Sequence, residues 1–264
     1  MNPFTTHGVF SWVELMTADL AAAKKFYGEV FGWRFSASHE AAGFESAEIG
    51  VGRETIGSMA AGPPGCPVPP GWNTYVTVTD IAKTLEHIVG LGGRVVFGPQ
   101  DIPGVGRCAV VRDPWGAVLL TVQHAISSLP PGVVPEFRPA RMTPVGAFSW
   151  WGLLTPDAAA AKAFYGGVFG WTFENVPDYA YEYDVIAQDG QMIGGLMQGP
   201  AGTGPCWSVY VRVADTDAIC DNARRNGGTI LHGPEDLPAV GRLAVLQDPT
   251  GGVLCAMQWS MCNL

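Results

Sequence analysis

One segment of this chain occurs twice. The stretch FSWVELMTADLAAAKKFYGEVFGWRF at residues 10–35 returns as FSWWGLLTPDAAAAKAFYGGVFGWTF at residues 148–173. A second pair lies downstream: WNTYVTVTD at residues 72–80 is echoed by WSVYVRVAD at 207–215, and each is followed by a copy of GPxDxPxVGR. Duplication on this scale predicts two homologous halves that repeat one fold, and it argues against a single domain with a tail.

The duplication also sets the expected domain boundaries. A chain of 264 residues has room for two domains, each large enough for a core of its own. The segment at residues 127–144 contains five prolines and no periodic apolar pattern, which is typical of a linker. We therefore expect domains over residues 1–126 and 145–264. Each should hold two units, at residues 8–62 and 72–124 and at 146–200 and 207–259.

Composition excludes several classes of partner. The chain has 15 Lys and Arg against 24 Asp and Glu, and its net charge of -9 would repel a phosphate backbone, so nucleic acid is not an expected partner. No apolar run reaches the roughly 18 residues of a membrane span, and the N-terminus lacks a charged-then-apolar leader, so we expect a cytoplasmic protein without membrane contact. The six cysteines show no CxxC or CxxH spacing, which indicates free thiols.

The order of secondary structure within a unit follows from periodicity. Residues 9–17 alternate and are rich in β-branched and aromatic side chains, which indicates a strand. Asp19 lies at an N-cap position and apolar residues follow at helical spacing up to Gly32, so a helix is expected between them. Three shorter strands complete the unit, and this β-α-β-β-β order recurs along the chain. The tetrads DPWG and DPTG, at 113–116 and 248–251, predict tight turns.

These features together resemble the vicinal oxygen chelate superfamily, which includes glyoxalase I, extradiol dioxygenases, and fosfomycin and bleomycin resistance proteins. The resemblance rests on two β-α-β-β-β units per half, the FYxxVFGW helix end and the DPxG turn, and it covers nearly the whole chain. It implies an α+β fold of four βαβββ units that form two tandem glyoxalase-like domains, each a half-barrel cup. Within the family the chain is most similar to tandem actinobacterial proteins labelled glyoxalase-like or hydroxylase. One scaffold there hosts lyases, oxygenases, transferases and simple binders, so the fold does not specify an activity.

In that family the cup holds a divalent metal, bound by His, Gln or Glu from the first and last strand of each unit. By resemblance, these positions correspond here to Trp12, Ser58, Asn73, Leu120, Trp150, Gly195, Ser208 and Cys255. A catalytic metal needs about three protein ligands, and none of these residues is His, Asp or Glu. We therefore expect no metal and predict no other cofactor. Among the histidines, His39 and His124 are the two that could reach a cup rim, although a surface or loop position is the simpler expectation.

Strand alternation predicts which side chains face each cup. If Val13 and Leu15 pack under the helix, alternate residues of the same strand face the cup. An aromatic-walled concavity with few polar groups suits a small, flat, largely apolar ligand. The predicted ligand contacts are Trp12, Met16, Asn73 and Tyr75 in the first cup, and Trp150, Ser208, Tyr210 and Arg212 in the second.

The alternative is that these aromatic side chains simply fill the cup as core. The two copies differ at several cup positions, since Glu14 corresponds to Gly152 and Leu120 to Cys255. One cup could therefore be filled while the other is functional.

Two residues are candidates for catalysis. Glu14 is the only carboxylate expected to point into an apolar cup, where burial would raise its pKa and suit it to acid or base catalysis, unless it hydrogen-bonds a neighbour such as Tyr75 or lies at a wet rim. Cys255 lies on a strand expected to be buried, with no nearby His or Lys to lower its thiol pKa. Arg212 suggests recognition of a carboxylate or phenolate, with a surface ion pair as the alternative. Structural ion pairs are expected between Arg107 and Asp101 and between Arg242 and Asp236.

The sequence leaves several functions open. The leading hypothesis is a metal-independent protein that binds a small aromatic metabolite, for sequestration or resistance or as an accessory to a biosynthetic oxygenase. The second is a glyoxalase- or dioxygenase-type enzyme whose metal is bound by unexpected groups. The third is cofactor-free cyclase, isomerase or hydroxylase catalysis by Glu14 or Cys255. The loops at residues 62–72 and 127–144 also allow a protein partner, such as a second copy of the chain or a biosynthetic enzyme.

Overall fold

A computed structural model describes the chain except residues 42–43, 63–64, 126–128, 177–181, 201 and 261–264, and it gives no side-chain description for residues 39–41. The first half contains β1 (Phe10–Thr17), α1 (Leu20–Phe31), β2 (Arg34–Phe35), β3 (His39–Ala41), β4 (Phe44–Val51), β5 (Glu54–Ala61), β6 (Gly71–Thr77), α2 (Ile81–Gly90), β7 (Arg94–Ile102), β8 (Gly106–Arg112) and β9 (Val118–His124). The second half contains β10 (Phe148–Thr155), α3 (Ala158–Phe169), β11 (Thr172–Asn175), β12 (Tyr183–Gln188), β13 (Gln191–Gln198), β14 (Cys206–Arg212), α4 (Thr216–Arg225), β15 (Thr229–Leu237), β16 (Gly241–Gln247) and β17 (Val253–Trp259).

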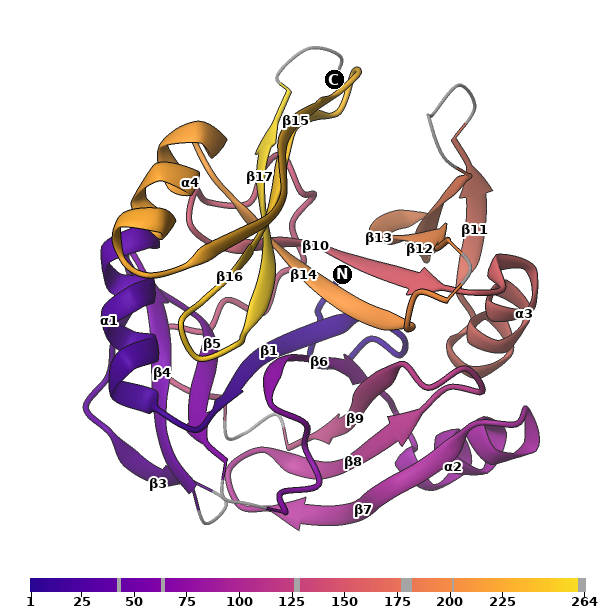
Figure 1. Ribbon diagram of the computed structural model, residues 1–264. Coiled ribbons are helices and arrows are strands. Elements are labelled where there is room, and N and C mark those ends of the chain that lie inside the picture. The colour runs from indigo at the N-terminus through magenta and orange to yellow at the C-terminus, as the bar shows by residue number, and fades with distance from the viewer. Residues whose placement is uncertain (42–43, 63–64, 126–128, 177–181, 201, 261–264) are drawn as a thin grey trace.

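Each half of the sequence forms one curved sheet. The strand order is β2-β4-β5-β1-β6-β9-β8-β7 in the first sheet, with β3 added on β4, and β11-β12-β13-β10-β14-β17-β16-β15 in the second. At the centre of the first sheet β1 is parallel to β5 and antiparallel to β6, and β10 is paired with β13 and β14 in the same way. The two units of a half therefore pair with each other. The predicted α+β fold of tandem glyoxalase-like domains is confirmed (Figure 1).

The helix boundaries follow the predicted signals. The side chain of Asp19 accepts a hydrogen bond from the backbone N–H of Ala22, and α1 ends at Gly32, whose left-handed φ of 68° a residue with a side chain rarely adopts. In the first unit two short strands, β2 and β3, follow the helix, and both pair with β4.

Strand alternation is also as predicted in β1. Val13 and Leu15 are buried in the core beneath the helices, whereas Trp12 and Glu14 lie on the opposite face and remain partly exposed. We use "first cup" for this face of the first sheet and "second cup" for the equivalent face of the second sheet. Among the described residues, no helix is long and apolar enough to cross a membrane.

The two halves are locked together by hydrogen bonds that cross between them. The hydroxyl of Tyr27 on α1 donates to Asp248 of the second half's DPxG turn over 2.8 Å, and accepts the indole N–H of Trp72 at 2.7 Å. The same arrangement occurs in reverse, because Tyr165 on α3 donates to Asp113 of the first half's turn over 2.9 Å. Figure 1 shows the resulting helix pairs, with α1 beside α4 and α2 beside α3.

Tryptophans reinforce this junction. Trp33 donates its indole N–H to the carbonyl of Gly146 at 2.7 Å, and Trp171 donates to the carbonyl of Gly8 at 2.6 Å. These indoles are buried together with the ring of Phe10, which stacks on Trp151 with centroids 4.9 Å apart. The core is therefore continuous across both halves.

The crossed tyrosines should matter for stability. Replacing Tyr27 or Tyr165 by Phe leaves a buried aspartate oxygen and an indole N–H without partners, so each change should lower the free energy of unfolding by about 1–3 kcal/mol. Urea unfolding monitored by tryptophan fluorescence measures this. Asp101→Asn, at an exposed ion pair, is the control and should cost at most about 1 kcal/mol. Equal losses of stability for all three changes would contradict a stabilising role of the two tyrosine hydroxyls.

Candidate functional site

The first cup carries a chain of hydrogen bonds on its central strands. The indole N–H of Trp12 donates to the Ser58 hydroxyl at 2.9 Å, and that hydroxyl donates to Oε1 of Glu14 at 3.0 Å. The second carboxylate oxygen of Glu14 accepts the hydroxyl of Tyr75 at 2.8 Å. Glu14 is adjacent to Ser58 in the pairing of β1 with β5, so strand register brings these groups together.

The surroundings of Glu14 shift its acidity. Protein atoms enclose the carboxylate while solvent still reaches part of the residue, and this desolvation raises the pKa of Glu14, opposed by the hydrogen bonds from Tyr75 and Ser58. Burial and the neighbouring Glu14 charge together raise the pKa of Tyr75 well above its usual value. Burial raises the pKa of the Cys108 thiol to about 12, with a smaller contribution from Glu14. At neutral pH the phenol and the thiol therefore keep their protons.

A histidine lies at one end of this cup. His124, the last residue of β9, lies 2.9 Å from the Ser11 hydroxyl through Nε2 and contacts the ring of Phe4 edge-on. Burial lowers the pKa of His124 to about 4, so the imidazole is neutral at physiological pH. The sequence favoured a surface or loop position for His124, whereas the structure places it half-buried at the end of β9; the side chain of His39 lies outside the described part of the structure.

The residues at the family's metal positions do not fit a divalent ion. Trp12 and Ser58 correspond to two ligand positions of the first unit, and they hydrogen-bond each other. The remaining positions of this half are Leu120, which has no donor atom, and Asn73, whose amide donates to the carbonyls of Pro69 and Gly71. Within the described residues, no group of three or more His, Cys, Asp or Glu side chains could hold a metal ion. The side chains at these positions of the first half therefore do not supply the ligand set of a divalent metal.

The second cup is filled by aromatic rings at the equivalent positions. Glu14 and Ser58 are replaced by Gly152 and Gly195, which pair in the same register. A Cβ atom on Gly152 would lie 3.0 Å from the Tyr210 ring, and one on Gly195 would overlap the hydroxyl of Tyr183. The two glycines thus make room for two tyrosine rings.

Two tryptophans complete this filling. The indole N–H of Trp150 donates to the Tyr183 hydroxyl at 2.8 Å, and the ring of Trp150 packs against Trp259 with centroids 5.8 Å apart. Trp259 takes the place that His124 has in the first half, and its N–H donates to Ser149 at 3.1 Å as His124 approaches Ser11. The first cup is therefore polar and partly open, and the second is packed with rings.

The other predicted site residues have mostly structural surroundings. Met16 is buried, and the Arg212 guanidinium donates to the backbone carbonyl of Thr143 in the segment that joins the halves. Ser208 is half-buried and hydrogen-bonds Cys206. Cys255 is buried against Tyr210, and burial raises the pKa of its thiol to about 12. A protonated, enclosed thiol is a poor nucleophile.

The structural ion pairs expected from the repeated VGR motif are present. Arg107 lies 3.2 Å from Asp101, and Arg242 lies 2.9 Å from Asp236 and also binds Asp217 on α4. These arginines hold the hairpin between the second and third strands of their units and are exposed to solvent in part, so they contribute to loop geometry and not to a cup.

Three residues of the cups were not found from the sequence as site residues. Cys108 faces Glu14 from β8, and Tyr183 and Trp259 fill the second cup. A usable signal existed for Tyr183, because two glycines at cup-facing strand positions imply that a large side chain from a neighbouring strand occupies their space.

Comparison with known proteins agrees with this architecture. The family model described as "Glyoxalase/Bleomycin resistance protein/Dioxygenase superfamily" matches residues 9–120 and again residues 147–256. A Mycobacterium tuberculosis protein named "Putative glyoxylase CFP32" is 34% identical over 256 residues, which cover 95% of each chain. The Streptomyces peucetius anthracycline biosynthesis protein DnrV is 28% identical, covering 92% of this chain and 90% of its own.

Solved structures show the same fold at low identity. The Mn(II)-bound glyoxalase from Novosphingobium aromaticivorans superposes with a TM-score of 0.63 at 15% identity, covering 96% of this chain and 83% of that one. A variant of homoprotocatechuate 2,3-dioxygenase from B. fuscum gives a TM-score of 0.64 at 17% identity, covering 98% and 73%. At these identities the likeness concerns the fold alone.

The pKa shift of Glu14 predicts a pH-dependent stability difference. The pKa of Glu14 is raised above 4.5 in the folded protein, so the folded state holds this proton more tightly than the unfolded chain does. The resulting stabilisation is fully present below the pKa of the unfolded chain. It is lost as the pH rises through the pKa of the folded protein. Glutamine never ionises, so Glu14→Gln should gain stability relative to the wild type as the pH rises from about 4 to 8. Urea unfolding across this range measures the difference. A stability difference that does not change with pH would refute the prediction.

The filled second cup predicts a specific clash. Gly195→Ala should destabilise the protein by about 1–3 kcal/mol, because the new methyl group overlaps Tyr183. In the first half, Ser46 occupies the strand position equivalent to Tyr183. Adding Tyr183→Ser to Gly195→Ala removes the clashing ring, so a double-mutant cycle should show that most of the loss in stability caused by the alanine is recovered. Thermal unfolding gives both values. Gly50→Ala is the control, because a Cβ atom there would lie at an ordinary contact distance of 3.6 Å from the carbonyl oxygen of Arg34. If the effects of Gly195→Ala and Tyr183→Ser simply added, the predicted clash between the new methyl group and Tyr183 would be wrong.

Proposed function

Since the chain belongs to the glyoxalase/bleomycin resistance protein/dioxygenase superfamily, we propose that it binds a small aromatic metabolite in its first cup without a divalent metal. The observation that carries the proposal is the contrast between the cups. The first keeps a partly exposed indole, carboxylate and phenol joined by hydrogen bonds, while equivalent space in the second is occupied by Tyr183 and Tyr210.

The chemistry of the first cup favours a flat ligand with a hydroxyl group. Trp12 and Tyr75 offer aromatic surface, and the ring faces of such residues suit a planar apolar body. Glu14 already accepts from Ser58 and Tyr75, but an ionised carboxylate has further acceptor sites, so a phenol or enol could donate to it. Two relatives named as anthracycline biosynthesis proteins, DnrV and DauV, support an aromatic polyketide as the class of ligand.

A second function, cofactor-free proton transfer, is favoured by the state of Glu14. Its raised pKa and its direct hydrogen bond to Tyr75 provide one group that can accept a proton and a phenol that can stabilise it. This would make the protein a cyclase, an isomerase or a hydroxylase-like accessory of the same ligand class. Cys255 is not part of this proposal, because its thiol is enclosed and protonated.

Binding of 1,8-dihydroxyanthraquinone, followed by calorimetry, tests the proposal. Affinity should be unchanged by prior treatment with EDTA, and Glu14→Gln should weaken it by about tenfold, the effect of a lost hydrogen bond to a charged group. The control is Tyr210→Phe, which changes a tyrosine of the filled cup and should have no effect. Binding that EDTA abolishes, or that Tyr210→Phe weakens most, would exclude the proposal.

The same variants separate a binder from an enzyme. If Glu14 transfers a proton, Glu14→Gln should abolish turnover of a substrate that still binds, whereas in a binding protein the change alters affinity only. Single-turnover measurements with purified metal-free protein, whose metal content is confirmed by elemental analysis, make the distinction.

A further inference from the structure

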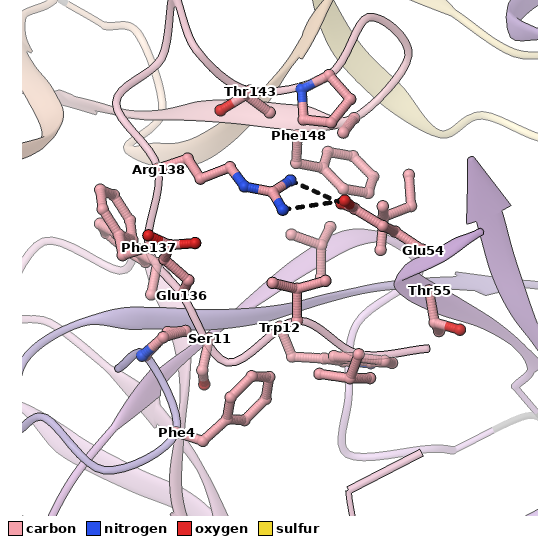
Figure 2. A pocket seen from close by; sticks show the side chains of 18 of the residues that line it. Phe4, Ser11, Trp12, Glu54, Thr55, Glu136, Phe137, Arg138, Thr143 and Phe148 are labelled. Carbon is pink, nitrogen blue, oxygen red and sulfur yellow. Dashed lines mark hydrogen bonds and ion pairs between the residues drawn. The ribbon is translucent and has the colours of Figure 1, made fainter. Parts of the chain in front are cut away.

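A cavity lies at the junction of the two halves, away from the carboxylate and phenol of the first cup. It is partly open to solvent, has a volume of about 120 Å³, and is lined by the start of β1, the start of β5, the segment before β10, and β10 itself (Figure 2). The residues at 133–144, which join the halves, close it on one side. Six aromatic rings line it: Phe4, Phe10, Trp12, Phe137, Phe148 and Trp151.

The cavity lies where the two halves differ in sequence at equivalent positions. Phe10 of the first half stacks on Trp151 of the second, whereas Phe148, the counterpart of Phe10, meets Val13 at the position equivalent to Trp151. One ring is therefore missing on the side where Val13 and Phe148 line the cavity. An enclosed cavity of about 150 Å³ holds benzene. The cavity here is smaller but partly open, so it limits a bound molecule to a single six-membered ring.

The polar groups at this cavity indicate which ring it would take. The indole N–H of Trp151 is buried and has no acceptor among the described residues, although the Trp151 ring lines the cavity. A buried donor without a partner is costly. The indole nitrogen has almost no accessible surface, so a shift of the Trp151 ring would bring the N–H to the cavity, where an oxygen atom of a bound molecule supplies the acceptor.

An ion pair stands between this cavity and solvent. Arg138 binds Glu54 through two hydrogen bonds of 2.7 and 2.9 Å, and the two side chains remain 27% and 29% exposed. Figure 2 shows both side chains reaching toward each other across the cavity, with Glu136 nearby. Two carboxylates against one guanidinium leave the lining with a net negative charge, which disfavours an anion.

We propose that this cavity is a second binding site, for a neutral single-ring aromatic molecule that carries an acceptor oxygen. The ring packs among the six aromatic side chains, and the oxygen accepts from Trp151. Because its walls come from both halves and from the segment that joins them, a bound molecule would contact all three. The site is separate from the first cup, but Trp12 lines it and also donates to Ser58, so it shares one residue with that cup.

Phenol, toluene and benzoate are the probes that test this site. Titrated by NMR against the full chain, phenol should bind about fivefold more tightly than toluene, the effect of one neutral hydrogen bond, and benzoate should bind more weakly than phenol. Trp151→Phe keeps the ring but removes the N–H, so it should abolish the preference for phenol over toluene while toluene still binds. Val134→Trp, which fills the cavity from its half-buried linker wall, should abolish binding of both.

Glu29→Gln, at an exposed position of α1 outside both sites, is the control and should leave phenol binding unchanged. Phenol binding that survives Val134→Trp but is lost in Glu14→Gln would overturn the proposal, since it would place the phenol in the first cup. Benzoate binding more tightly than phenol, or no phenol binding up to its solubility limit, would also overturn it. The anthraquinone titration uses a different ligand and different variants, so the two proposals fail independently.

Discussion

The structure depends on a pair of reciprocal hydrogen bonds between its halves. Asp113 and Asp248 each use one carboxylate oxygen to bind backbone N–H groups of their own turn and the other to accept the hydroxyl of a tyrosine from the opposite half. The same tyrosines accept an indole N–H, so these buried polar groups satisfy one another in an apolar interior. The turn of one half and the helix of the other thus stabilise each other, and we expect the halves to unfold together.

A shared core of this kind allows the two cup faces to diverge. The groups that join the halves lie on the helix side of the sheets, whereas Glu14, Gly152 and their neighbours lie on the other side, where a substitution does not disturb the crossed tyrosines. Glycine at positions 152 and 195 is compatible with the fold because Tyr183 and Tyr210 occupy the adjacent space. The first half has the polar side chains of Glu14 and Ser58 there, and both remain partly exposed.

Much of this organisation could be predicted from the sequence, because it depends on local periodicity. The alternation of β1 placed Val13 in the core and Glu14 in the cup, and the Asp19 and Gly32 signals set the ends of α1. The contents of the second cup depend on register between strands that are distant in sequence, which the residue pattern of one strand does not contain. For this reason the role of Tyr183 was missed, and Arg212, correctly assigned to its strand, was found to bind the joining segment.

The cavity at the junction has the same origin as the filled cup. Two copies of one fold meet in a shared core, and side chains near the junction pack against the other copy, as Phe10 does on Trp151, so a size difference such as Val13 against Trp151 changes the packing between the copies. The joining segment passes over one side only, and its Arg138 binds Glu54 at that place. A site of this kind belongs to neither repeat, so comparison of the repeats alone cannot reveal it. Duplication thus accounts for the shared scaffold, and departure from symmetry accounts for the junction cavity and for the difference between the two cups.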